Sequence, residues 1–334
     1  MPELYLPKKI YFGEDSAEKF TQNAFENILI LSDAEDVNKK SLISKIKCDF
    51  DKNVACSSVI IEPDTDMILD KSMQYISKNI PDQIIAVGSA KLCDIAAFIS
   101  YQSGIEYSIV PFFSPCSMND FEKADYKTYC HSPTEVVLDP MFLSYVNSGT
   151  VGYDSMSCFA YAVDALIGGC NSVIEVIAVS SASTILNNVI GAYRGNYKTI
   201  QKVLYALYYA VLAHRNSCNN SVLNEVCSFF NQLGISKQTA AAICIPEIAE
   251  YYRDNIPVEL ARYTGLLRSG EDSTFSINRL IERIRKVQAA LNIPRSVNAI
   301  LNGNELYLAF RENTHLPADL LDLCFYGSFK FMKL

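Results

Sequence analysis

A glycine–serine pair marks the first place where this chain could do chemistry. Gly88 and Ser89 follow the apolar run Ile84–Val87 and precede residues 91–100, whose apolar side chains recur at helical spacing. A strand that turns into a helix in this way directs backbone N–H groups and the positive end of the helix dipole at one point, which suits a phosphate. Similar turns occur throughout α/β domains, so phosphate binding and a plain structural turn both stay open.

An acidic residue follows an earlier apolar run. Asp33 comes just after residues 27–31 (NILIL), which have the composition of a buried strand. In dinucleotide-binding folds, a carboxylate at such a place accepts hydrogen bonds from an adenosine ribose. The local sequence SDAED is also rich in turn formers, so Asp33 is equally well interpreted as a cap or turn residue.

The sequence predicts two kinds of secondary-structure arrangement, one in each part of the chain, and the first contains these residues. Up to about residue 145, short apolar runs alternate with amphipathic stretches, which predicts a parallel sheet with right-handed crossovers. Ligands of such sheets bind at the carboxyl ends of the strands, where we expect Asp33 and Gly88. From about Gly149 the alternation stops and long helical patterns follow. We therefore expect an α/β chain, with an N-terminal Rossmann-like parallel-sheet domain (residues 1–148) followed by an all-helical domain (residues 149–334).

Composition narrows the classes of function. The net charge of −8 over 334 residues argues against nucleic acid as a partner, because no basic face is available to neutralise phosphates. No apolar run approaches membrane-spanning length, and the N-terminal residues lack the apolar core of a signal peptide, so we expect a cytoplasmic protein. The eleven cysteines are scattered, which favours small buried side chains over disulfides or zinc. Three histidines are few for an enzyme that relies on histidine-bound metal.

Seven stretches in chain order carry a family resemblance: PKKIYFGEDSAEKF, ILILSDAED, EPDT, QIIAVGSAKLCDIAA, TEVVLDPMF, GYDSMSCFAYAVDAL and TAAAICIPEIAEYYRDN. Over roughly residues 8–255 the chain resembles the iron-containing alcohol dehydrogenase family, within the dehydroquinate-synthase-like fold. The resemblance implies a dinucleotide-binding domain, a helical domain that holds a metal, and NAD(P)-dependent oxidation of an alcohol or reduction of an aldehyde.

The resemblance also assigns residues to the cofactor, with departures from the family pattern. Where the family has three glycines and a serine, this chain has Gly88, Ser89, Ala90 and Lys91, and two family threonines become Phe112 and Phe113. Lys91 would supply a cation to the phosphates or stay an ordinary solvated residue, and the two phenylalanines would stack on a ring or pack internally. The acidic residue at the ribose position implies a preference for NAD over NADP. The expected cofactor residues are Asp33, Gly88, Ser89, Lys91, Asp94, Ser114 and Ser117.

The metal site that the resemblance implies is largely lost. The family holds its metal with one aspartate and three histidines, which correspond here to Asp154, Cys158, Leu223 and Lys237. Leucine has no lone pair and an ammonium repels a dication, so we expect no metal. A family histidine that lines the substrate cleft corresponds to Cys227.

Several interpretations of this altered site stay open. The Lys237 ammonium, paired with Asp154, would replace the metal's charge and polarise a carbonyl or orient a phosphate. Alternatively, Lys237 forms a plain ion pair or is solvated at a helix start, or the two cysteines and Asp154 bind a soft metal. The expected catalytic residues are Asp154, Lys237 and Cys227.

Three hypotheses follow. The first is an oxidoreductase that acts on a small alcohol or aldehyde with NAD(P), without the family's metal. The second is a degenerate, non-redox member that binds a nucleotide or a phosphate metabolite, or serves as a partner subunit. The third, a lyase or cyclase of the dehydroquinate-synthase type, suffers from the same loss of ligands. All three predict small-molecule partners rather than nucleic acid or membrane, and all allow a homodimer.

Overall fold

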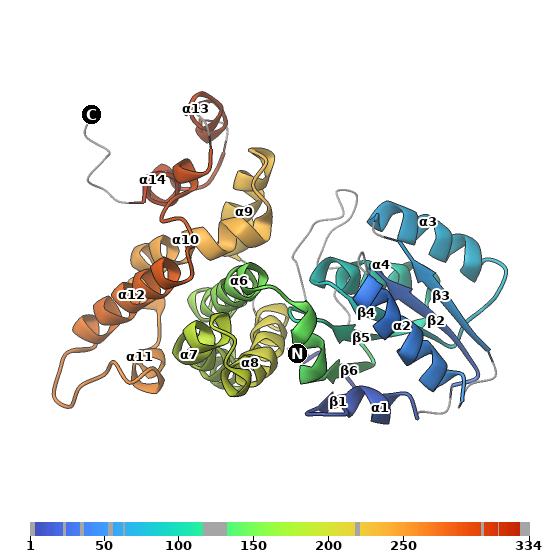
Figure 1. Cartoon of the computed structure of the whole chain (residues 1–334). Coiled ribbons are helices and arrows are strands. Elements are labelled where there is room, and N and C mark those ends of the chain that lie inside the picture. The colour runs from blue at the N-terminus through green and yellow to red at the C-terminus, as the bar shows by residue number, and fades with distance from the viewer. Residues whose placement is uncertain are drawn as a thin grey trace. The chain divides into compact units, whose positions relative to one another are not determined.

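The structure, a computed structural model, describes residues 4–22, 25–33, 37–52, 56–62, 64–115, 132–217, 221–301, 304–312 and 314–327. The chain divides into two compact units, Met1–Asn147 and Ser148–Leu334 (Figure 1). The first unit contains the sheet and the second is helical. This is the α/β architecture expected from the sequence.

The sheet of the first unit has six strands in the order β1-β6-β5-β4-β2-β3, and all described strand pairs are parallel. β2 and β4 are neighbours, with Ile28 opposite Gln83 and Leu31 opposite Ala86. Their carboxyl ends therefore lie side by side, which brings the residues that follow them together. The strands are β1 (Lys9–Phe12), β2 (Asn27–Ser32), β3 (Cys56–Ile61), β4 (Gln83–Gly88), β5 (Glu106–Pro111) and β6 (Glu135–Leu138).

Apolar side chains hold helices onto this sheet. Ile30 and Val87 lie in one buried cluster with Phe20 and Phe50, so α1 and α2 cover the same face of β2 and β4. α4 packs against β4 and β5 and also contacts α3. The helices are α1 (Ser16–Phe20), α2 (Val37–Phe50), α3 (Thr65–Ile76) and α4 (Ala90–Ser103), and a 3₁₀ turn, η1, covers Pro140–Tyr145.

The second unit is built around α6 (Ser148–Ile167), which is buried from Asp154 to its end and contacts α7, α8, α9 and α10. A helix that is apolar around its whole circumference belongs in the interior of a domain. The remaining helices are α7 (Ser172–Tyr193), α8 (Tyr197–Arg215), α9 (Val222–Gln232), α10 (Lys237–Tyr251), α11 (Val258–Tyr263), α12 (Ser273–Ala290), α13 (Glu305–Arg311) and α14 (Ala318–Tyr326), with short 3₁₀ turns at Arg253–Asn255 (η2) and Val297–Ala299 (η3).

α10 contains a proline in its interior. Pro246 has no N–H, so the carbonyl of Ala242 loses its usual donor within the helix. Gln288 of α12 replaces that donor, because its buried side-chain amide donates to the carbonyl of Ala242 at 2.6 Å and to that of Ile243 at 3.1 Å. The helix therefore continues past the proline with the help of a neighbour.

The structure differs from the sequence analysis on one apolar run. α7 is long and apolar enough to cross a membrane by length and composition, whereas we expected no such run. Half of its apolar window is buried within the protein, and α7 packs against α6 and α8. α7 thus packs along part of its surface within this unit.

Candidate functional site

The carboxyl ends of β2 and β4 bring Asp33 and Ser89 into contact. The backbone N–H of Ser89 donates to Asp33 Oδ1 at 3.1 Å, and the Ser89 hydroxyl donates to Asp33 Oδ2. Asp33 and the Gly88–Ser89 turn were expected at carboxyl ends of strands, and the pairing of β2 with β4 makes them neighbours. The bond itself was not predicted, because Ser89 was expected to contact a cofactor and Asp33 a ribose.

Gly88 makes room for this contact. A Cβ on Gly88 would overlap Asp33 Oδ1 and would lie 2.7 Å from Leu92 Cδ2. The carboxylate therefore lies directly against the backbone of β4, at a distance that only glycine permits. Of the three glycines in the family pattern, the one retained here accommodates the chain's own aspartate.

Ser89 also begins the helix that follows. As the N-cap of α4, its Oγ accepts a hydrogen bond from the backbone N–H of Leu92 at 3.3 Å. Lys91 is exposed in the first turn, whereas Asp94 is buried on the inner side of the helix. The positive end of the α4 dipole therefore lies at this turn, close to the Asp33 carboxylate.

The remaining cofactor candidates lie after β5. Ser114 is buried, and Ser117 lies outside the described residues. Phe112 packs against Phe142 and Tyr145, with ring centroids 5.9 Å and 6.4 Å away, and Phe113 is buried as well. Both phenylalanines therefore serve internal packing, one of the two alternatives that the sequence left open.

In the helical unit, three helices contribute to the expected catalytic centre. Asp154 on α6 accepts a hydrogen bond at Oδ1 from the side-chain amide of Gln238 on α10. Lys237 is only 2% exposed, and its Nζ donates to Asn224 Oδ1 on α9 at 3.4 Å. Neither Gln238 nor Asn224 was predicted from the sequence, because nothing in the pattern distinguishes a buried amide side chain from an ordinary polar surface residue.

The residues at the family's ligand positions do not fit a divalent metal. Cys158 and Leu223 are fully buried, but leucine offers no donor atom and Lys237 contributes a positive charge. Gln238 already occupies one oxygen of the Asp154 carboxylate. Within the described residues, no group of three or more His, Cys, Asp or Glu side chains is placed to hold a metal ion.

Cys227 lies close to the same centre and is fully buried. Burial raises the pKa of its thiol well above the usual value, Cys324 and Asp164 raise it further, and Lys237 opposes them. The thiol is therefore protonated near neutral pH, which does not suit a nucleophile.

Asp164 is a second buried carboxylate on α6, and it was not predicted as a site residue. It accepts hydrogen bonds from the backbone N–H of Leu223 at 2.9 Å and pairs with His214 Nε2 at 3.1 Å. The same imidazole nitrogen lies 3.3 Å from Ser221 Oγ. Since one nitrogen serves both neighbours, this is a structural junction at the start of α9 rather than a catalytic triad. Its position in an otherwise apolar stretch of sequence could have identified Asp164, because a buried carboxylate needs hydrogen-bond or charged partners.

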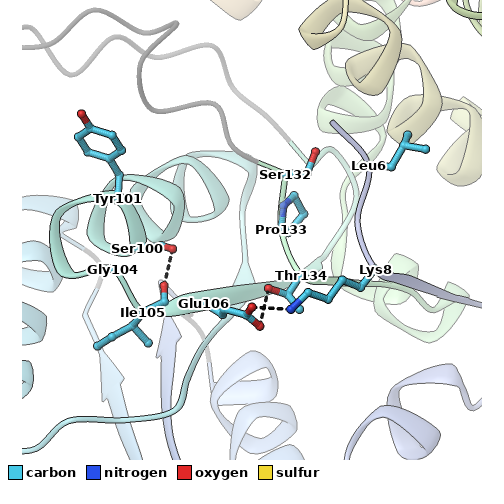
Figure 2. Close-up of a pocket in the computed structure, with 10 residues that line it drawn as sticks. All are labelled: Leu6, Lys8, Ser100, Tyr101, Gly104, Ile105, Glu106, Ser132, Pro133 and Thr134. Atoms are coloured by element: carbon cyan, nitrogen blue, oxygen red, sulfur yellow. Dashed lines mark hydrogen bonds and ion pairs between the residues drawn. The ribbon is translucent and has the colours of Figure 1, made fainter. Parts of the chain in front are cut away.

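A pocket of about 400 Å³ lies at the other end of the sheet, where β5 and β6 begin (Figure 2). Figure 2 shows Lys8 and Thr134 converging on Glu106, whose Oε1 and Oε2 they bond at 2.5 Å and 3.2 Å. The Lys8 ammonium lowers the pKa of Glu106. These groups satisfy one another, and the pocket is remote from Asp33 along the strands, so it forms no part of the predicted site.

Comparison with known proteins identifies the fold of this chain. No protein-family model matches the chain, and no curated protein matches it. Among solved structures, it resembles alcohol dehydrogenase from Oenococcus oeni with a TM-score of 0.83 and 14% identity, covering 97% of this chain and 100% of that one. It also resembles maleylacetate reductase from Agrobacterium tumefaciens, with a TM-score of 0.77 and 14% identity, covering 98% of this chain and 99% of that one.

A third solved structure is sulfoacetaldehyde reductase from Bifidobacterium kashiwanohense in complex with NAD⁺, with a TM-score of 0.78, 14% identity, and 98% of each chain covered. These neighbours are proteins of the iron-containing alcohol dehydrogenase family. The resemblance inferred from sequence is therefore confirmed at the level of the fold. The chain has the fold of the iron-containing alcohol dehydrogenases.

Proposed function

We propose that this protein is an NAD(P)-dependent oxidoreductase that acts on a small alcohol or aldehyde without a bound metal. The fold supports the first part of the proposal, and the sulfoacetaldehyde reductase with this fold is an NAD⁺ complex. The buried Lys237, together with the Gln238–Asp154 bond, supports the second part.

In this proposal a nicotinamide dinucleotide binds at the turn after β4. Asp33 would accept hydrogen bonds from the adenosine ribose, and the start of α4 with Lys91 would face the phosphates. When bound, the dinucleotide supplies the hydride donor or acceptor. The Asp33 carboxylate repels a 2′-phosphate, so we propose NAD over NADP.

Lys237 is the residue that carries the metal-free part of the proposal. Its ammonium is held among buried side chains, with Asn224 as one partner. A cation in such surroundings interacts strongly with a polarised carbonyl oxygen, because little water screens it. In this role Lys237 orients the substrate carbonyl and stabilises negative charge on its oxygen. Asp154 is held by Gln238 and keeps the local charge balanced.

A second function is supported by one observation. Ser89 and Ala90 stand where the family has glycines, and their Cβ atoms crowd the approach of a pyrophosphate. A non-redox protein that binds a nucleotide or phosphate metabolite, or a partner subunit, would tolerate this change. Under either alternative we propose a cytoplasmic protein that forms a homodimer and has no nucleic-acid or membrane partner.

Three measurements on the purified protein distinguish the oxidoreductase from the non-redox alternative. NADH and NADPH are titrated by fluorescence, bound metal is measured by elemental analysis, and reduction of a panel of small aldehydes is followed with and without a chelator. We expect NADH binding, less than one tenth of an equivalent of metal, and turnover that a chelator leaves unchanged. NADH binding without any turnover would support the non-redox alternative. Stoichiometric iron or zinc would contradict the metal-free proposal.

A further inference from the structure

The Ser89 hydroxyl both donates and accepts a hydrogen bond within the protein. It donates to Asp33 Oδ2 and accepts from the N–H of Leu92 at 3.3 Å, while the Ser89 backbone N–H donates to Asp33 Oδ1 at 3.1 Å. One residue thus contacts both oxygens of the carboxylate and ties them to the first turn of α4. Hydrogen bonds to an ionised acceptor are among the stronger ones in proteins.

The backbone of β4 at Gly88 also restricts the Asp33 carboxylate. A Cβ at Gly88 would overlap Asp33 Oδ1, which shows that this oxygen lies against the strand backbone with no spare room. Asp33 follows β2 and Ser89 follows β4, and the ladder between these strands fixes the spacing of the two residues. The side chain of Asp33 therefore has one defined orientation.

We propose that Ser89 is a positioning residue that fixes the Asp33 carboxylate and thereby sets the preference for a dinucleotide with a free 2′-hydroxyl. This inference rests on the proposed function. A mobile carboxylate can turn away from a 2′-phosphate and relieve the repulsion, whereas one held at both oxygens cannot. The remaining lone pairs of the fixed carboxylate are available to ribose hydroxyls. Ser89 therefore acts through Asp33 and not as a ligand of the pyrophosphate.

The test is the ratio of the Kd values for NADPH and NADH, measured by fluorescence titration of the full-length protein. Ser89→Ala removes the hydroxyl and should lower this ratio about tenfold, the effect of one hydrogen bond to a charged group. Ser89→Thr keeps a hydroxyl and should retain most of the preference. Ser100→Ala is the matched control, since Ser100 lies in the same helix and its Oγ donates to the carbonyl of Ile105 at 2.5 Å.

A double-mutant cycle separates positioning from folding. Asp33→Asn should lower the same ratio, and adding Ser89→Ala should then change it little, because the charge that Ser89 positions is gone. An equal loss of affinity for both dinucleotides in Ser89→Ala, or an unchanged ratio, would overturn the inference and leave the proposed function standing. Failure of the wild-type protein to bind either dinucleotide would overturn both.

Discussion

The side-chain amide of Gln238 donates a hydrogen bond to Asp154 Oδ1, and Asp154 is the residue that the sequence resemblance assigns to the family's metal-binding aspartate. This bond joins α6 to α10. A cation that bound Asp154 Oδ1 would have to displace this amide. The two helices are thus linked by an amide–carboxylate hydrogen bond at this point.

We first predict that a metal site forms when the family's three histidine ligands are introduced. The triple variant Cys158→His, Leu223→His and Lys237→His should bind about one equivalent of Zn²⁺, because three imidazoles and Asp154 then supply a complete set of donors. Elemental analysis after gel filtration measures the metal, with Leu223→His alone as the control. Equal zinc in the wild type and the triple variant would contradict the assignment of these positions.

The second prediction concerns catalysis by Lys237. Lys237→Met keeps the length of the side chain and removes its charge, so kcat/KM for aldehyde reduction should fall about 10²- to 10³-fold. Lys198→Met is the matched control, because Lys198 is exposed on α8. A fall of less than threefold in Lys237→Met, with NADH binding intact, would remove Lys237 from the proposed mechanism.

The third prediction concerns the interior proline of α10. Gln288→Leu leaves the Ala242 carbonyl without its donor from α12 and should lower the free energy of unfolding by about 1–3 kcal/mol. Adding Pro246→Ala supplies a backbone N–H in place of the amide and should recover part of the loss. Urea denaturation of the four proteins in this cycle gives the coupling energy, and simple additivity would argue against the proposed exchange of donors.

The fourth prediction concerns pH. Burial raises the pKa of Glu247 above its ordinary value of 4.5, and the hydrogen bonds and charge of Arg285 oppose this effect. A carboxyl whose pKa is raised on folding stabilises the protein below the unfolded pKa, and that contribution is lost as pH rises through the folded pKa. The unfolding free energy of the wild type relative to Glu247→Gln should therefore fall from about pH 4 to pH 7. A rise over that interval would mean that the Arg285 ion pair outweighs desolvation.

Much of the fold follows from the sequence, for reasons visible in particular elements. Residues 27–31 and 84–87 are short apolar runs bounded by polar residues, so the strands were predictable, and parallel topology brought Asp33 to Gly88. The helices α11, α13 and α14 were not predicted, because they have six, seven and nine residues and show too few turns for periodicity to be seen.

The candidate site was less predictable than the fold. The identity of Leu223 and Lys237 was enough to argue against metal binding, since this depends on atom types alone. The partners of Asp154 and Asp33 depend on side-chain orientation, which the pattern of apolar residues does not encode. Ser89 illustrates the limit, because its hydroxyl could have reached either a ligand phosphate or the neighbouring aspartate.

The bond between Ser89 and Asp33 also has a consequence for the order of folding. The two residues are 56 positions apart, and they meet only after β2 and β4 have paired in register. Their contact should therefore form late, with a φ-value near zero. Removing it should speed unfolding of the first unit and leave its folding rate almost unchanged, so the bond contributes to how long the folded state persists.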